Sequence, residues 1–229
     1  MQISIDGPAG AGKSSVARAL AHRLGYIYID TGAMYRAVTW LALKNDISAV
    51  DEEGLTLLAQ TADIRFEQSE NDDDQQVYCR DHNVTQEIRS VKVSRAVSAI
   101  SVVSGVRSAL VKLQQEMAAD HDVVMEGRDI GTVVLPSADL KVYLTASVEE
   151  RADRRQKERA AGGQEQSLAE IVAEIMKRDA DDSGRADSPL RPPDDSVILD
   201  TTDLSLPEVV AAVAMMVKDL GGGIHPEMS

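Results

Sequence analysis

Apolar and polar positions along this chain follow two periods, and each period predicts a different kind of element. Strand-like segments are short, apolar or alternating, and are bounded by glycine or polar residues. Five of them predict strands: residues 2–6, 26–29, 122–126, 138–144 and 196–200. Helical segments separate these strands, so the pattern predicts an α/β fold with a parallel sheet whose strand ends share one face.

Helical spacing of apolar residues fills most of the remaining chain. The first helix is expected to begin near Lys13 and to stop at Gly25, and Asp30 or Thr31 is expected to cap the second. Later helical segments are expected near residues 55–58, 90–118 and 206–220.

Residues 63–84 have a different character and predict a small hairpin from residues 64–67 and 76–79. Its polar turn contains Asp72–Asp74, which we expect to be solvated and not to bind a metal. Residues 221–229 are expected to form a flexible tail.

One stretch between the first strand and the first helix combines glycines, a lysine and serines at a defined spacing. It fits the pattern G-x-x-x-x-G-K-[ST] and consists of Gly7, Pro8, Ala9, Gly10, Ala11, Gly12, Lys13, Ser14 and Ser15. Glycines let backbone N–H groups turn toward phosphate oxygens, and the helix N-terminus favours the same anion. Lys13 is expected to reach the β- and γ-phosphates, and the Ser14 hydroxyl to ligate Mg²⁺. The stretch therefore predicts binding of a nucleoside triphosphate.

Composition narrows the class of protein further. The chain has 229 residues, which suits one domain with insertions, and a formal net charge of −14, which disfavours nucleic acid and anionic membranes as partners. The single cysteine, Cys79, excludes an internal disulfide and is expected to be an inert strand residue. The four scattered histidines disfavour a zinc site, and we find neither a signal peptide nor an apolar run of about 18 residues. A cytoplasmic protein is expected.

Arginines gather after the predicted strand ends and in the charged segment 147–186. They are Arg36, Arg107, Arg128, Arg151, Arg154, Arg155, Arg159, Arg178, Arg185 and Arg191. Arginine clusters bind phosphates through paired hydrogen bonds. We expect Arg36 and Arg128 to bind a ligand, whereas Arg159 and Arg191 are expected to form surface ion pairs. The polar segment 147–186 is expected to be a mobile lid that closes over the ligand.

Taken together, these motifs resemble the bacterial cytidylate kinase family over about residues 2–219. The residues that carry the resemblance are 7–15, 30–36, 86–89, 126–134 and 178–185. The resemblance implies a P-loop NTPase-type, five-stranded parallel sheet flanked by helices. It divides the chain into a core (about 1–61, 106–146 and 187–220), a monophosphate-binding insertion (about 62–105) and a helical lid (about 147–186). Glu126 and Thr31 stand where the family often has Asp and Ser, and both keep the chemistry.

The resemblance also implies an activity, the transfer of a phosphoryl group from ATP to CMP and dCMP with Mg²⁺ in pyrimidine metabolism, by a monomer. The CMP phosphate would contact Thr31, Arg36, Arg128 and Arg185. The ribose would contact Arg178 and Asp182, and the cytosine would contact Ser98, Arg107 and Asp129. Tyr35 and Gly127 complete the CMP-binding set. Arg154 or Arg155 would help to cover ATP in the lid, and Lys13, Arg128, Arg178 and Arg185 would form the catalytic set.

Three alternatives remain at the level of sequence. Another P-loop kinase would act on a different monophosphate or on a small alcohol such as shikimate. Asp129 and Arg107, as groups that would recognise a cytosine base, disfavour this alternative. A GTP-dependent switch protein would need an N-K-x-D motif, which the chain lacks. A non-catalytic nucleotide-binding module would be expected to lose Lys13, Arg36 or Arg128, and all three are present.

Overall fold

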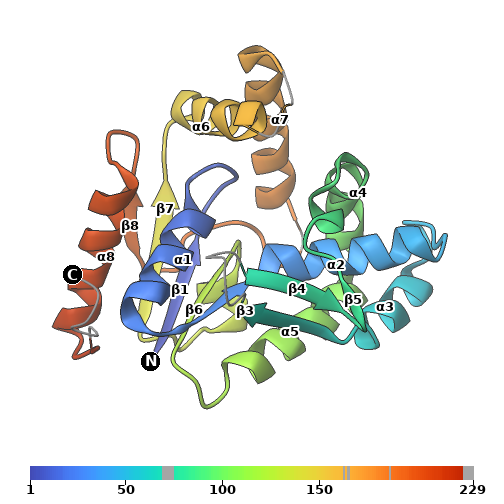
Figure 1. The fold of residues 1–229 in the computed structure, drawn as a ribbon, viewed down its shortest axis with the longest axis horizontal. Helices are drawn as coiled ribbons and strands as arrows, with labels where there is room; N and C mark the ends of the chain where they lie inside the picture. Colours follow the sequence, from blue (N-terminus) through green and yellow to red (C-terminus); the bar gives the residue numbers. More distant parts are fainter. Residues whose placement is uncertain (69–74, 162, 164–165, 186, 224–229) are drawn as a thin grey trace. The chain divides into compact units, whose positions relative to one another are not determined.

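The computed structural model describes residues 1–68, 75–161, 163, 166–185 and 187–223 (Figure 1). The chain divides into two compact units, Met1–Ile29 with Ala118–Ser229, and Asp30–Met117. The predicted turn at Asp72–Asp74 lies outside the described residues, as does most of the predicted tail. The predicted insertion 62–105 falls within the second unit, and the division into core, insertion and lid remains a prediction.

The first unit is built on the five-stranded parallel sheet that the sequence predicts. Its strands are β1 (Gln2–Asp6), β2 (Ile27–Asp30), β6 (Val123–Gly127), β7 (Leu140–Thr145) and β8 (Val197–Asp200). They lie in the order β2-β6-β1-β7-β8, and β1 pairs in parallel with both β6 and β7. The central strand β1 therefore delivers residue 7 to the carboxyl edge of the sheet, between two neighbours.

Helices α1 (Lys13–Leu24) and α8 (Leu206–Asp219) pack against this sheet through one continuous apolar core. Ile3 and Ile5 of β1 are fully buried in it, together with Leu20 of α1 and Val213 of α8. Helix α1 ends where the sequence predicts, because Gly25 adopts a left-handed conformation (φ 69°) and its N–H bonds back to the last turn. This core fixes the position of the loop between β1 and α1.

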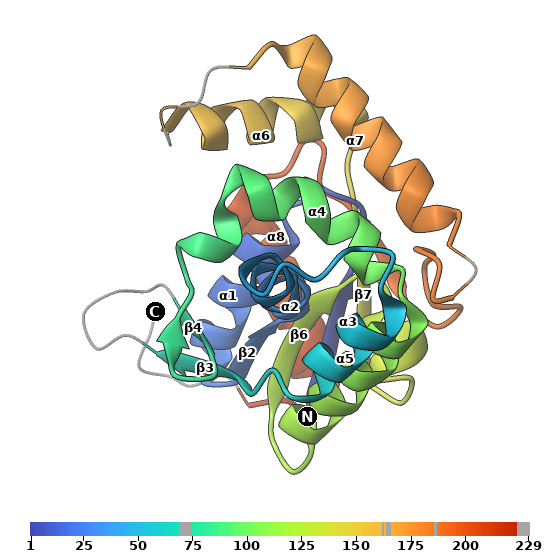
Figure 2. The ribbon, with the colours of Figure 1, turned by 90° about the vertical axis from the view of Figure 1, so that its right-hand side faces the viewer.

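Two polar helices follow β7 and pack against each other, α6 (Val148–Ala161) and α7 (Leu168–Ser183) (Figure 2). Ser167 and Glu170 form a capping box at the start of α7. The helices bury only a small apolar cluster, centred on Ala152, Ile171 and Ile175. Such a small core fits the predicted lid, whose movement remains a prediction.

The second unit combines helices with a small antiparallel sheet. Its elements are α2 (Thr31–Lys44), α3 (Glu52–Gln60), β3 (Ile64–Gln68), β4 (Gln75–Cys79), β5 (His82–Asn83), the 3₁₀ turn η1 (Glu87–Arg89), α4 (Val91–Ser101) and α5 (Ser104–Ala118). The predicted hairpin is present as β3 and β4. Asp30 caps α2, and its carboxylate accepts from the Ala33 N–H at 2.9 Å.

The sequence pattern over residues 90–118 predicts continuous helical spacing, but the structure divides the segment into α4 and α5, which meet at 100°. Gly105 lies at the start of α5 so close to Thr56 that an added Cβ would collide with its side chain. At this turn α5 therefore packs closely against a residue distant in sequence. Among the described helices none is long and apolar enough to span a membrane alone, and only this bent pair meets that criterion jointly.

Cys79 is fully buried in β4, as its place in an apolar strand predicts. Its Sγ–H donates to the Ala62 carbonyl oxygen at 3.3 Å. Burial raises the pKa of the thiol to about 11. The thiol is therefore protonated and unreactive in the folded protein.

Candidate active site

The loop between β1 and α1 has the backbone shape that phosphate binding requires. Gly7, Gly10 and Gly12 all have positive φ angles, of 147°, 79° and 87°. A Cβ at Gly7 would collide with the Leu144 carbonyl oxygen of β7, so only glycine fits there. No side chain caps the start of α1, which leaves its first N–H groups available for an anion.

Lys13 lies buried at the start of α1, inside this loop. Its Nζ donates to the Pro8 carbonyl oxygen at 2.8 Å. Burial, with the nearby positive charge of Arg128, lowers the pKa of Lys13 to about 7, although Glu126 opposes the shift. The site therefore holds a lysine that an anionic ligand would return to its fully charged state. Ser14 and Ser15 follow on the exposed side of the first turn.

Two carboxylates lie at the ends of β1 and β6. Asp6 accepts from the backbone N–H groups of Ile130 and Gly131, at 2.8 Å each, and burial raises its pKa to about 6. Glu126 accepts from the Tyr28 hydroxyl at 2.6 Å. Asp6 thereby anchors the short π-helical turn η2 (Ile130–Val134) beside the phosphate loop.

Three arginines from different parts of the first unit converge on one buried carboxylate, Asp182. Arg128 Nε donates to it at 2.8 Å, Arg178 Nε lies 3.9 Å away, and Arg185 forms a short contact with its other oxygen. Burial raises the pKa of Asp182, but Arg128 and Arg185 outweigh it and the net shift is downward. The structure thus gathers three predicted phosphate- and ribose-binding arginines around a shared counter-ion, and the predicted contacts to ligand remain predictions.

Arg154 of α6 lies at the entrance to the phosphate loop. Its guanidinium donates to Glu150 at 2.8 Å and to the backbone and side-chain oxygens of Thr201 at 2.6 and 3.0 Å. A Cβ placed on Gly12 would lie 3.7 Å from Arg154 Nη1, so the two are neighbours. Arg155 is half-buried, and burial lowers its pKa. The predicted contact of Arg154 with ATP remains a prediction.

The loop after β6 holds the two other predicted residues of the first unit, Gly127 and Asp129. Gly127 ends β6, and its carbonyl oxygen accepts from Arg128 Nη1 at 3.3 Å. Asp129 is buried, and its negative charge contributes to the raised pKa of Asp6.

The remaining predicted residues belong to the second unit. Arg36 of α2 donates to the Ile88 carbonyl oxygen at 3.1 Å and to the Ser94 hydroxyl at 2.8 Å. Arg107 of α5 donates to the Ser101 carbonyl oxygen at 3.4 Å. Its guanidinium carbon lies 5.6 Å from the centre of the Tyr35 ring. Thr31 is buried at the start of α2, and Ser98 is half-buried on α4.

Sequence reasoning missed two residues that contact the phosphate loop. The sequence places Arg151 of α6 among the clustered arginines and Asp179 within the motif 178–185, but it predicts no contact of either residue with the loop. They form an ion pair of 2.6 Å, and both bond to the backbone of Ala9. The expected surface pairing of Arg159 is present, because it donates to Glu174 at 2.8 Å. Arg191 is exposed.

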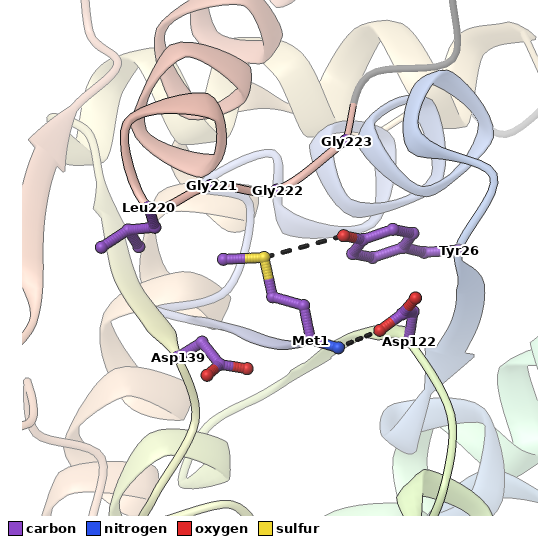
Figure 3. Close-up of a pocket in the computed structure, with 8 residues that line it drawn as sticks. All are labelled: Met1, Tyr26, Asp122, Asp139, Leu220, Gly221, Gly222 and Gly223. Atoms are coloured by element: carbon purple, nitrogen blue, oxygen red, sulfur yellow. Dashed lines mark hydrogen bonds and ion pairs between the residues drawn. The ribbon is translucent and has the colours of Figure 1, made fainter.

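A hollow of about 520 Å³ lies elsewhere in the first unit, lined by Met1, Tyr26, Asp122, Asp139 and the turn after α8 (Figure 3). These lining residues precede β1, β2, β6 and β7, so the hollow is at the amino ends of the strands. The N-terminal ammonium group already pairs with Asp122, and Asp139 accepts from the Gln2 N–H at 2.7 Å. The hollow is therefore separate from the phosphate loop.

The sheet order and the phosphate loop at the end of its central strand define a P-loop nucleotide-binding protein. The family model described as "Cytidylate kinase" matches residues 3–219. The cytidylate kinase of Carboxydothermus hydrogenoformans is 49% identical over 92% of this chain and 94% of its own. That of Enterococcus faecalis is 50% identical over 96% of this chain and 97% of its own. The chain therefore belongs to the cytidylate kinase family.

Solved structures of other proteins are only distantly similar to this chain. The shikimate kinase from Acinetobacter baumannii is 15% identical, covers 95% of this chain and 93% of its own, and gives a TM-score of 0.45. At that distance the likeness does not bear on the substrate.

Proposed function

We propose that this chain transfers the γ-phosphoryl group of ATP to CMP and dCMP, forming CDP and dCDP. The observation that carries the proposal is identity of about half the residues with cytidylate kinases over nearly the whole length of both chains. The phosphate loop and the arginines around Asp182 supply the chemistry that such a transfer needs. The proposal includes action as a monomer in the cytoplasm.

The donor is proposed to bind at the phosphate loop, residues 7–15. Its backbone N–H groups and Lys13 offer donors to phosphate oxygens, and Arg154 and Arg155 extend the positive charge. Ser14 presents an exposed hydroxyl, an oxygen ligand of the kind Mg²⁺ prefers beside phosphate oxygens. A bound Mg²⁺ would neutralise charge on the phosphates. Lys13 has three N–H donors, so it can keep its bond to the Pro8 carbonyl oxygen and still contact the phosphates of ATP.

The acceptor phosphate is proposed to bind Thr31, Arg36, Arg128 and Arg185, with Arg178 and Asp182 at the ribose. A phosphate monoester is largely ionised at pH 7, so its oxygen needs no general base. Phosphoryl transfer then depends on positioning and on neutralisation of charge, which Lys13 and the arginines provide. Asp182 contributes by holding three arginines in place before a ligand arrives.

The cytosine is proposed to contact Ser98, Arg107 and Asp129, beside Tyr35 and Gly127. Cytosine carries an N4 amino donor next to two acceptors, N3 and O2. A carboxylate accepts from N4, and a guanidinium donates to the acceptors. Asp129 and Arg107 are the residue types that complement this pattern.

An acceptor panel tests the proposal. ADP release from ATP is measured with CMP, dCMP, UMP, AMP, GMP and shikimate, and CMP and dCMP are expected to give the highest kcat/KM. Faster turnover with shikimate or a purine monophosphate would identify a different kinase. A parallel titration with ATP and GTP separates a kinase from a GTP-dependent switch, and binding without turnover of any acceptor would indicate a non-catalytic module.

A further inference from the structure

An ion pair between α6 and α7 forms hydrogen bonds to the backbone of the phosphate loop. Arg151 of α6 donates to Asp179 of α7 at 2.6 Å, and the Arg151 side chain is only 5% exposed. Arg151 Nη1 also donates to the Ala9 carbonyl oxygen at 2.9 Å, while Asp179 accepts from the Ala9 N–H at 3.3 Å. Both backbone groups of Ala9 are thus held by one salt bridge.

These contacts fix the orientation of two successive peptide planes. The peptide between Pro8 and Ala9 is held at its carbonyl oxygen by Lys13, at 2.8 Å, and at its N–H by Asp179. The next peptide is held at the Ala9 carbonyl oxygen by Arg151. No described peptide bond is cis, so the Gly10 N–H lies on the opposite side of the C–N bond from the Ala9 carbonyl oxygen and points away from Arg151. The side chains of α6 and α7 therefore determine where loop N–H groups point.

The backbone at Gly10 fits closely against the same part of α6. A Cβ there would lie 3.1 Å from both the Cβ and the carbonyl oxygen of Arg151. Gly10 also has a φ of 79°, which disfavours any side chain. Helix α6 and the tip of the loop therefore pack closely at Gly10.

We propose that Arg151 and Asp179 are positioning residues for the donor triphosphate, because they preset the peptide planes at Pro8, Ala9 and Gly10. This inference rests on the donor site of the proposed function. A loop whose N–H groups are already oriented loses less freedom when the phosphates bind, so affinity is higher. The pair also links the base of the lid directly to the donor site.

The test compares variants of the pair with a matched pair in the same two helices. Arg151→Met removes the guanidinium but keeps an aliphatic side chain, Asp179→Ala removes the acceptor, and Asp179→Asn keeps an acceptor oxygen without the charge. Arg159→Gln and Glu174→Gln are the controls, since Arg159 and Glu174 also join α6 to α7, at 2.8 Å. Each variant is titrated with a non-hydrolysable ATP analogue and Mg²⁺, and KM is measured for ATP and for CMP.

We expect Arg151→Met and Asp179→Ala to raise the Kd of the analogue and the KM for ATP about tenfold, the effect of losing one charged hydrogen bond. The KM for CMP should stay within about twofold. Asp179→Asn should raise both constants by less than Asp179→Ala does, because its single amide oxygen can still accept from either the Ala9 N–H or Arg151, although not from both. The controls should leave both substrates unaffected.

An unchanged Kd in a folded Arg151→Met variant, or an equal rise in the controls, would overturn the proposal. If Arg151→Met does not fold, Asp179→Ala carries the test. The analogue titration needs no acceptor, so it remains decisive if CMP proves not to be the substrate.

Discussion

At the scale of a single residue, two requirements on the charge of Lys13 oppose each other. A phosphate-binding lysine must be charged, yet burial and Arg128 hold its pKa at about 7. In the structure the ammonium group of Lys13 donates to the Pro8 carbonyl oxygen. A triphosphate brings several negative charges to the same place and favours the charged form.

Replacement of Lys13 by alanine should nearly abolish phosphoryl transfer and leave the fold intact. The ammonium group stabilises charge that develops during transfer, an effect worth several kcal/mol of activation free energy. The measurement is kcat with CMP, with the circular dichroism spectrum as a check on folding. Near-normal turnover of a folded variant would contradict the role given to the loop.

Binding of an ATP analogue should take up a proton above pH 7. The pKa of free Lys13 is about 7, and the bound phosphates raise it, so a lysine that is mostly neutral at pH 8 becomes charged on binding. Affinity should accordingly fall as the pH rises from 7. Calorimetry at pH 8, where the analogue is fully ionised, in two buffers of different ionisation enthalpy measures the uptake.

The control for this measurement is Lys13→Arg, because a guanidinium stays protonated at any of these pH values. Its proton uptake should vanish. The same uptake in Lys13→Arg as in the unmodified chain would assign the proton to another group.

Asp129 is expected to set the preference between cytosine and uracil. Uracil presents an oxygen, O4, where cytosine presents the N4 amino group, and this oxygen would face a carboxylate without a proton between them. Asp129→Asn should therefore lower the ratio of kcat/KM for CMP to that for UMP, since an amide can donate to O4. An unchanged ratio would show that Asp129 does not read the base.

At the scale of elements, α6 and α7 combine a weak core with specific polar contacts. Their shared apolar cluster is small, and much of the remaining contact is ionic: Arg159 with Glu174, and Arg151 with Asp179. Elements that bury little apolar surface open at low free-energy cost. The contacts to Ala9 hold the base of the pair.

Hydrogen exchange should report this difference. Amides of α6 and α7 are expected to exchange faster than those of α1 and α8 in the free protein, and to become protected when a bisubstrate analogue binds. Helix α1 serves as an internal reference for slow exchange, because it packs in the main apolar core. Equal protection with and without the analogue would argue against closure of the lid.

At the scale of the whole molecule, the parts that the sequence predicts well are those determined by neighbouring residues. The sheet strands lie within about two residues of their predicted bounds because a buried strand is a short apolar run whose length is limited by polar residues on both sides. The phosphate loop has the predicted shape because its glycines adopt positive φ angles.

The parts that the sequence does not predict depend on residues far apart in the chain. The apolar spacing does not reveal the turn between α4 and α5, where Gly105 packs closely against Thr56, a residue far away in the sequence. The partners of Arg151 could not be predicted for the same reason, since four carboxylates lie within α6 and several more within α7. The sequence motifs 126–134 and 178–185 contain Arg128, Arg178 and Arg185. Only the fold identifies Asp182 as their common partner.

The single buried cysteine makes the natural chain a ready background for site-specific labelling. Cys79 has no exposed surface and a pKa of about 11, so alkylating reagents at pH 8 should leave the folded protein unmodified and react fully only in denaturant. Mass spectrometry of the treated protein measures this, and rapid modification without denaturant would contradict it. A cysteine introduced at exposed Leu168 would then be the one reactive thiol, and a spin label or fluorophore attached there would follow the lid without removal of any natural residue.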